Sequence, residues 1–257
     1  MRRFPIALLV SLAASVLACT PAPQGGPPQP SQEQQPVYGG RLNVRVNPDP
    51  WEWDLSLGGK SSPNDTGIGL TADSLLGFKV GPDVGHSELV LQPELAQRWE
   101  VSPDARSFTF NLRQDARFAN TAPVNGRELT SADVKFSMEY ASRSGEFAGK
   151  KPTGILEWMY EEMERIETPD KHTVTVRFKE PFVPFAAYMA SEWSPVLARE
   201  VYDRDGHMKE MVVGSGPFVL DRGESQKGSR WVWKKNPTHW REGKPYLDEL
   251  RWLVIPE

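Results

Sequence analysis

The stretch from Leu91 to Tyr140 constrains the fold most, because it carries one local structural signal after another. Residues 93–99 have a short helical pattern that opens on a proline, at a first helical position where its missing N–H costs nothing. Residues 102–104, Ser-Pro-Asp, predict a turn. Residues 108–112 then alternate aromatic or aliphatic with polar side chains, which is the period of a half-buried strand.

The second half of this stretch predicts a loop and a helix. Residues 120–126 are loop-like. Thr130 and Ser131 offer a hydroxyl that can cap a helix, and Asp133 would lie in its positive first turn. Residues 134–141 give that helix a broad apolar face. Together these signals predict a strand followed by a loop and a helix.

Two blocks of sequence resemble a known family. The first has the order P-x-L-A-x-x-W-x-V-S-x-D, an aromatic strand ending in L-R, and then F-x-N, P-V and T-x-x-D-V-x-F-S. The second runs from Val212 through V-V-G-S-G-P-F and W-x-W-K-K-N-P-x-x-W to G-K-P-Y-L-D-E-L-R-W-L-V-I-P-E. In this order they resemble the peptide/nickel-type extracellular solute-binding proteins of ABC importers (family 5).

The matching residues are Pro93, Leu95, Ala96, Trp99, Val101, Ser102, Asp104, Phe110, Leu112, Arg113, Phe118, Asp133, Val134, Phe136, Gly214, Ser215, Gly216, Pro217, Phe218, Asn236, Pro237, Trp240, Pro245, Tyr246, Asp248 and Pro256. The resemblance implies an α/β fold (mixed α+β), the first lobe of a two-lobed periplasmic-binding-protein fold. It implies subdomain Ia at residues 37–48 and 188–257 and subdomain Ib at 49–187. The second lobe and the final stretch that returns to the first are expected to be missing.

Several further elements are expected outside the first block. They are a strand at 42–46, a helix within 65–78, a helix at 156–163, a hairpin at 166–180 with its turn at 169–171, and a short helix within 181–188. Gly214 and Gly216 are expected to take positive φ in a tight turn. We interpret Ser215 between them as part of a buried turn, since a nucleophile elbow needs G-x-S-x-G.

The N-terminus resembles a bacterial lipoprotein signal. Arg2 and Arg3 form a positive n-region, residues 6–16 form an apolar segment too short to span a bilayer, and Cys19 ends a lipobox-like Leu-Ala-Cys. The alternative is an ordinary secretory signal that happens to contain a cysteine. The lipobox implies a signal peptide at 1–18 and a lipidated Cys19. Residues 19–36, rich in Pro, Gln and Gly, then predict a disordered tether.

Composition excludes several classes of function. The net charge of −4 without a basic block argues against nucleic acid as a partner. The four histidines have no ligand-like spacing, and a single cysteine permits no disulfide within one chain. We therefore expect no metal site, and the resemblance implies no cofactor, no catalytic residue and a monomer.

Three tryptophans are candidate ligand contacts. Trp51 and Trp53 lie in a polar segment without periodic partners, so they either line a cleft or fill a gap beneath the loop. Trp193 likewise belongs either to the core or to the cleft. The resemblance adds Ser61, Ser62 and Asn64, in the loop that approaches the ligand's backbone.

Two patterns that suggest other chemistry fail on inspection. Gly58 to Ser61 would complete a phosphate loop only if a glycine replaced Asp54. Glu157, Glu161, Glu162 and Glu164 are more consistent with a solvated helix face than with paired catalytic carboxylates, because no apolar pocket is evident around them.

The resemblance implies a non-enzymatic substrate-binding lipoprotein of an ABC importer. It would capture an oligopeptide or other small polar solute and deliver it to the permease and ATPase subunits. It would be anchored by lipid in the periplasm or on the outer face of the cytoplasmic membrane. Two alternatives stay open: a secreted glycosidase-type hydrolase using Trp51 and Trp193 as sugar platforms, and an envelope-assembly lipoprotein with the same fold.

Overall fold

The computed structural model describes residues 36–256 except 51, 57–61, 86 and 151–153. Cys19, the signal peptide and the tether, together with Trp51 and Ser61, lie outside the described residues. Residues 37–257 form one compact unit, and it contains two four-stranded sheets and a separate hairpin.

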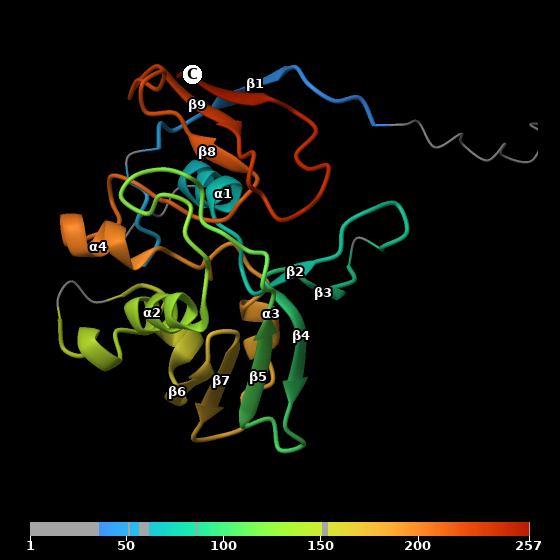
Figure 1. Ribbon diagram of the computed structural model, residues 1–257, viewed down its shortest axis with the longest axis vertical. Helices are drawn as coiled ribbons and strands as arrows, with labels where there is room; N and C mark the ends of the chain where they lie inside the picture. Colours follow the sequence, from blue (N-terminus) through green and yellow to red (C-terminus); the bar gives the residue numbers. More distant parts are fainter. Residues whose placement is uncertain (1–35, 51, 57–61, 86, 151–153, 257) are drawn as a thin grey trace, which may run out of the picture. The chain divides into compact units, whose positions relative to one another are not determined.

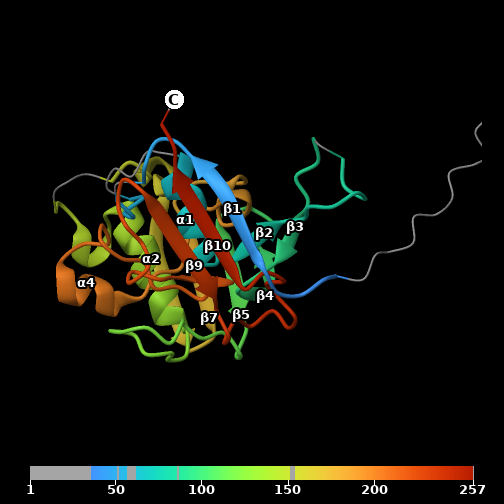
Figure 2. The same ribbon diagram turned by 90° about the horizontal axis from the view of Figure 1, so that it is seen from above.

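The first sheet joins the two ends of this unit. Its order is β1 (Arg41–Val46), β10 (Glu249–Val254), β9 (Arg230–Lys235) and β8 (Phe218–Leu220). β1 pairs parallel to β10, whereas the other pairs are antiparallel. Figure 2 shows β1, β10 and β9 side by side, and α1 (Ser62–Thr71) lies beneath them in Figure 1. The expected strand at 42–46 is confirmed.

The second sheet contains the predicted aromatic strand. Its order is β4 (Ala96–Val101), β5 (Ser107–Leu112), β7 (Thr173–Phe178) and β6 (Met163–Asp170), all antiparallel. The alternate residues of β5 are almost fully buried. The Phe108 ring packs edge-on against Phe178 and Phe185, at centroid distances of 5.7 and 5.2 Å. The alternation of apolar and polar residues in the sequence therefore corresponds to one buried face of the strand, because successive side chains point to opposite faces.

Helices cover this sheet. α2 (Ser131–Ser142) begins where the sequence predicts, with the Thr130 N–H donating to Asp133 Oδ2 at 2.9 Å. α3 (Phe185–Tyr188) places Phe185 among the strand aromatics. α4 (Arg199–Asp205) follows on the way back to the first sheet, and Figure 1 shows α4, α2 and α3 in this order from left to right.

Two expectations about secondary structure are wrong, and two others are right only in part. Residues 93–99 form β3 (Leu91–Pro93) and the start of β4, because Trp99 pairs with Phe110 across the sheet. Residues 156–163 form only a 3₁₀ turn, η2 (Glu157–Tyr160), since Met163 already pairs with Phe178 in β6. The helix expected within 65–78 lies earlier in the chain: α1 begins at Ser62 and ends at Thr71, and β2 (Leu76–Phe78) follows. The hairpin is confirmed, but its turn is at residues 171–172.

The segment of residues 71–76, here called the junction segment, ties the two sheets together through backbone hydrogen bonds. Its carbonyls accept from Gly216, Val196 and Leu95 at 3.0, 2.9 and 3.2 Å, respectively. A side-chain bond adds to these, because Asp73 Oδ2 accepts from Ser215 Oγ at 2.9 Å. The predicted buried turn at Ser215 is confirmed.

Gly214 and Gly216 are required for a different reason from the one expected. Neither has positive φ. A Cβ on Gly214 would lie 2.3 Å from the Thr71 carbonyl oxygen, and one on Gly216 would lie 2.6 Å from the Thr71 carbonyl carbon. The backbone of the turn therefore lies directly against the end of α1, where only glycine fits.

Candidate functional site

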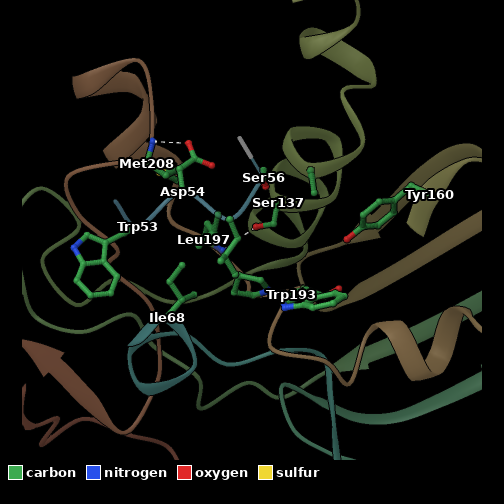
Figure 3. Close-up of a pocket in the computed structure, with 13 residues that line it drawn as sticks. Trp53, Asp54, Ser56, Ile68, Ser137, Tyr160, Trp193, Leu197 and Met208 are labelled. Atoms are coloured by element: carbon green, nitrogen blue, oxygen red, sulfur yellow. Dashed lines mark hydrogen bonds between the residues drawn. The ribbon is translucent and has the colours of Figure 1, made fainter. Parts of the chain in front are cut away.

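A small polar hollow lies where six parts of the chain converge. It is lined by the loop after β1, by α1, α2 and η2, by residues 193–197 and by Met208. Figure 3 shows Trp53 on one side of it and Tyr160 on the other, with Asp54 and Ser137 between them. Its volume of about 10 Å³ is room for a single water molecule.

A buried carboxylate anchors the loop at this hollow. Asp54, 2% exposed, accepts a 2.5 Å hydrogen bond from the Tyr140 hydroxyl and a 3.2 Å bond from the Met208 N–H. Burial and the negative charge of Asp54 raise the pKa of Tyr140 well above its usual value. The phenol therefore stays a hydrogen-bond donor at neutral pH and holds the loop on α2.

A second polar group faces the hollow from the 193–197 segment. The buried Ser194 hydroxyl has no hydrogen-bond partner of good geometry among the described residues. It neighbours Tyr160, whose pKa burial raises to about 12. Leu197 fixes this segment on α2, because its N–H donates to Ser137 Oγ at 2.8 Å. A buried hydroxyl without a partner is a group that a bound water or ligand can satisfy.

Trp53 lines the hollow but packs as a core residue. It is 6% exposed, and its ring stands edge-on to Trp231 and Trp233 at 5.2 and 6.1 Å. Gly67 admits it, since a Cβ there would lie 2.5 Å from the Trp53 ring. Of the two roles the sequence left open, these contacts favour filling a gap beneath the loop.

The other predicted site residues lie at the hollow, in α1 or outside the described residues. Trp193 is 41% exposed and lines the same hollow, so the structure brings Trp53 and Trp193 together. Ser62 and Asn64 were expected in a loop, but both lie in the first turn of α1. Trp51, Ser61 and Cys19 fall outside the described residues, so their roles stay predictions.

Sequence reasoning missed the residues that shape the hollow most. Asp54 was considered only as an obstacle to a phosphate loop, and Tyr140 only as part of an apolar helix face. Their contact spans 86 positions of sequence, so no local pattern announces it. The available signal was an acidic residue between two apolar ones, Trp53 and Leu55, a pattern that Glu52 shares.

Metal chemistry and membrane crossing find no support in the described part of the chain. Nowhere in residues 36–256, the undescribed gaps aside, do three or more metal-ligating side chains gather. The helices within that part are also too short or too polar to cross a bilayer.

The sequence and the fold can be compared with those of known proteins. The family described as "Bacterial extracellular solute-binding proteins, family 5 Middle" matches residues 90–257. This chain belongs to that family. The resemblance inferred from the two sequence blocks is therefore confirmed.

Curated relatives agree. The chain is 30% identical over 189 residues to the probable D,D-dipeptide-binding periplasmic protein DdpA of Escherichia coli, covering 71% of this chain and 33% of the relative. It is 29% identical over 195 residues to the dipeptide-binding protein of the same organism, covering 71% and 35%. The family 5 chain thus spans about a third of the length of these relatives.

Solved structures show the same fold. The periplasmic binding protein AgaA from A. tumefaciens R10, in complex with agropinic acid, is 28% identical with a TM-score of 0.71 over 84% of this chain and 40% of that one. DppA from Helicobacter pylori, in complex with the peptide STSA, is 26% identical with a TM-score of 0.69, covering 86% and 44%. The mixed α/β architecture expected from sequence is that of periplasmic binding proteins.

Proposed function

We propose that this family 5 chain is the first-lobe part of a substrate-binding lipoprotein that captures a peptide-like solute and delivers it to an ABC permease. The family membership supports solute binding, and the dipeptide-binding relatives and the peptide complex of the H. pylori protein support the ligand class. The role is non-catalytic, as the names of the relatives suggest, and neither alternative function has a specific contact in its favour.

The hollow between the sheets is the observation that carries the proposal. An exposed indole, Trp193, and the buried Ser194 hydroxyl, which has no hydrogen-bond partner of good geometry among the described residues, line it together. Ligand sites combine aromatic walls with a few polar groups of this kind. A water molecule held in the hollow would link the Ser194 hydroxyl to a peptide backbone group, and the exposed Trp193 indole would cover an apolar part of the ligand.

We also propose that the two sheets belong to two subdomains. The first sheet lies within residues 37–48 and 188–257, and the second within 49–187. In a two-lobed binder, hinge closure buries the ligand and excludes water. The surface offered by this lobe is then one wall of the cleft.

Because one wall buries only part of a ligand, we expect residues 36–257 alone to bind peptides weakly. A ¹H–¹⁵N titration with Ala-Ala-Ala up to about 10 mM reaches the affinity range expected of a partial site. Saturable shifts should include the Trp193 indole, assigned with a Trp193→Phe variant. The Trp240 indole, which donates to Asp73 Oδ2 at 2.8 Å and does not line this hollow, serves as an internal comparison. A spectrum that stays unchanged throughout contradicts peptide binding.

The anchor at Cys19 is tested separately. Lipidation would hold the protein on the membrane, with about 0.8 kcal/mol for each buried methylene. Cys19→Ala should move the protein from the membrane fraction to the soluble fraction, whereas Ser31→Ala in the tether should not. Membrane association that survives Cys19→Ala would exclude the lipid anchor.

A further inference from the structure

A wide groove adjoins the hollow through Tyr160, which lines both. Its volume is about 500 Å³, enough for a large side chain. The end of α2 forms one wall with Ser142 and Ser144, and η2 forms the other. The proposed function does not depend on this groove.

An exposed indole stands on the η2 wall. Trp158 is 48% exposed, although it is one of the largest apolar side chains in the molecule. Its ring is held edge-on by Tyr188, with centroids 5.2 Å apart and an interplanar angle of 78°. An aromatic ring fixed by a neighbour and still open to solvent is suited to contact a ligand at low entropic cost.

The charge of the groove is of one sign. Among its described lining residues the charged ones are Glu157 and Glu161. The Gly154 N–H donates to Glu157 Oε1 at 2.6 Å and so orients that carboxylate. Glu161 forms no ion pair with another described residue.

Two cations near the end of α2 point elsewhere. The guanidinium carbon of Arg143 lies 4.7 Å from the Tyr140 ring centroid, and Lys150 Nζ lies 4.9 Å from that of Phe147. Neither residue lines the groove. The two carboxylates are therefore not neutralised by these neighbours.

We infer that this groove is a subsite for a cationic side chain, lysine or arginine, of a peptide ligand. The inference rests on the proposed function and adds selectivity to it. The ammonium or guanidinium would lie over the Trp158 face, where the ring quadrupole attracts a cation. Glu157 and Glu161 would flank it, and the serine hydroxyls, 2.8 Å apart, would accept further hydrogen bonds.

A peptide series tests this selectivity on the full chain. Ala-Lys-Ala, Ala-Leu-Ala and Ala-Glu-Ala are titrated separately into ¹⁵N-labelled protein, with the Trp158 indole signal assigned by Trp158→Phe. Ala-Lys-Ala should shift that signal saturably and bind about fivefold more tightly than Ala-Leu-Ala, the factor expected of one exposed cation–π contact. The preference should weaken with added salt.

Matched variants locate the effect. Glu161→Gln and Glu157→Gln should each reduce the preference for Ala-Lys-Ala at least twofold. Glu164→Gln, nearby in sequence but paired with Arg165 at 2.9 Å, should leave it unchanged. Glu161→Lys should shift the preference toward Ala-Glu-Ala, and circular dichroism melts confirm that each variant folds.

The outcomes separate the two claims. If none of the three peptides shifts any signal, the proposed function fails and the inference fails with it. If all three shift the Trp193 signal with equal affinity, or if the lysine preference survives both glutamine variants, peptide binding stands and the cationic subsite is wrong.

Discussion

The two four-stranded sheets differ in how completely residues 36–256 cover them. On β5 of the second sheet, Phe108, Phe110 and Leu112 are each at most 3% exposed. On β1 of the first sheet, Leu42 is 47% exposed and lies on an edge strand. Beside it a groove of about 470 Å³ runs between Val44, Trp252 and α1. The second sheet is thus a closed core, whereas the first retains an open apolar face.

The largest effect expected from this difference is the cost of emptying the closed core. Phe110→Ala should lower the free energy of unfolding by about 4 kcal/mol, because it leaves a cavity in a close-packed site. Leu42→Ala should change it by less than about 0.5 kcal/mol, since its side chain already contacts water. Urea unfolding followed by circular dichroism measures both. Equal losses at the two positions would contradict the contrast between the sheets.

A smaller loss is expected at the contact that joins the sheets. Gly214→Ala would place its Cβ against backbone atoms of Thr71 and Ala72, which no rotamer change can relieve. We expect a loss of about 3 kcal/mol, in the range of overpacked sites. Gly69→Ala in α1 is the matched control, because its nearest neighbour would lie 3.7 Å away. The control should gain up to about 1 kcal/mol in helix propensity.

The reason for Gly214 differs in kind from the features that the sequence could predict. Alternation along β5 gave the buried face of the second sheet, and the hydroxyl–carboxylate pattern at Thr130 gave the start of α2. Both are local. Gly214 is needed because the backbone of Thr71, distant in sequence, lies against it. The sequence alone suggested positive φ as the reason, and it could not show this close approach.

Tertiary contacts also decide the structure of residues 93–99, which were predicted to be helical, and the residues of the candidate site. Residues 93–99 satisfy a helical pattern, but pairing of Trp99 with Phe110 overrides it. Trp53 and Trp193 could be chosen because a tryptophan stands out in a polar segment. Asp54 and Ser194 could not, since their role comes from burial produced by tertiary packing.

The loop at the hollow offers a test of intermediate size. Tyr140→Phe removes the donor to Asp54 and should cost about 2 kcal/mol, because a buried carboxylate loses a partner. Tyr202→Phe, in the same aromatic cluster, serves as the control, since its hydroxyl makes no hydrogen bond with another described residue. Thermal unfolding of both variants measures the difference. Similar melting temperatures would show that the bond does not hold the loop.

A pH-dependent contribution to stability comes from Arg127, which bridges a carboxylate of α2 and one of α4. Arg127 pairs with Asp133 and Glu200, and its hydrogen bond lowers the pKa of Glu200. A depressed pKa stabilises the fold above the carboxyl's unfolded pKa, and this contribution is lost as pH falls through the folded value. Partial exposure limits it to less than about 1 kcal/mol.

Glu200→Gln should therefore be less stable than wild type at pH 7, and the difference should shrink as the pH is lowered below about 4. Urea unfolding at pH 7, 5 and 3.5 measures this trend. Glu164→Gln, on the exposed face of β6, should show no such trend. A difference for Glu200→Gln that grows on acidification would mean that the pKa is shifted in the opposite direction.

The smallest effect on folding, and the sharpest test of the open face, is expected at Leu42. Leu42→Lys places a charge on the exposed edge strand, so the free energy of unfolding should stay within about 0.5 kcal/mol of wild type. Self-association should decrease, because a lysine on an edge strand opposes strand pairing between molecules. Val101→Lys on β4, the edge of the second sheet, is similarly exposed at 45%, and Val101 does not line the groove between β1 and α1. Sedimentation at increasing concentration should show less association for Leu42→Lys and an unchanged profile for Val101→Lys. An equal decrease in both would attribute association to strand edges in general, and the apolar face beside β1 would then have no special part in it.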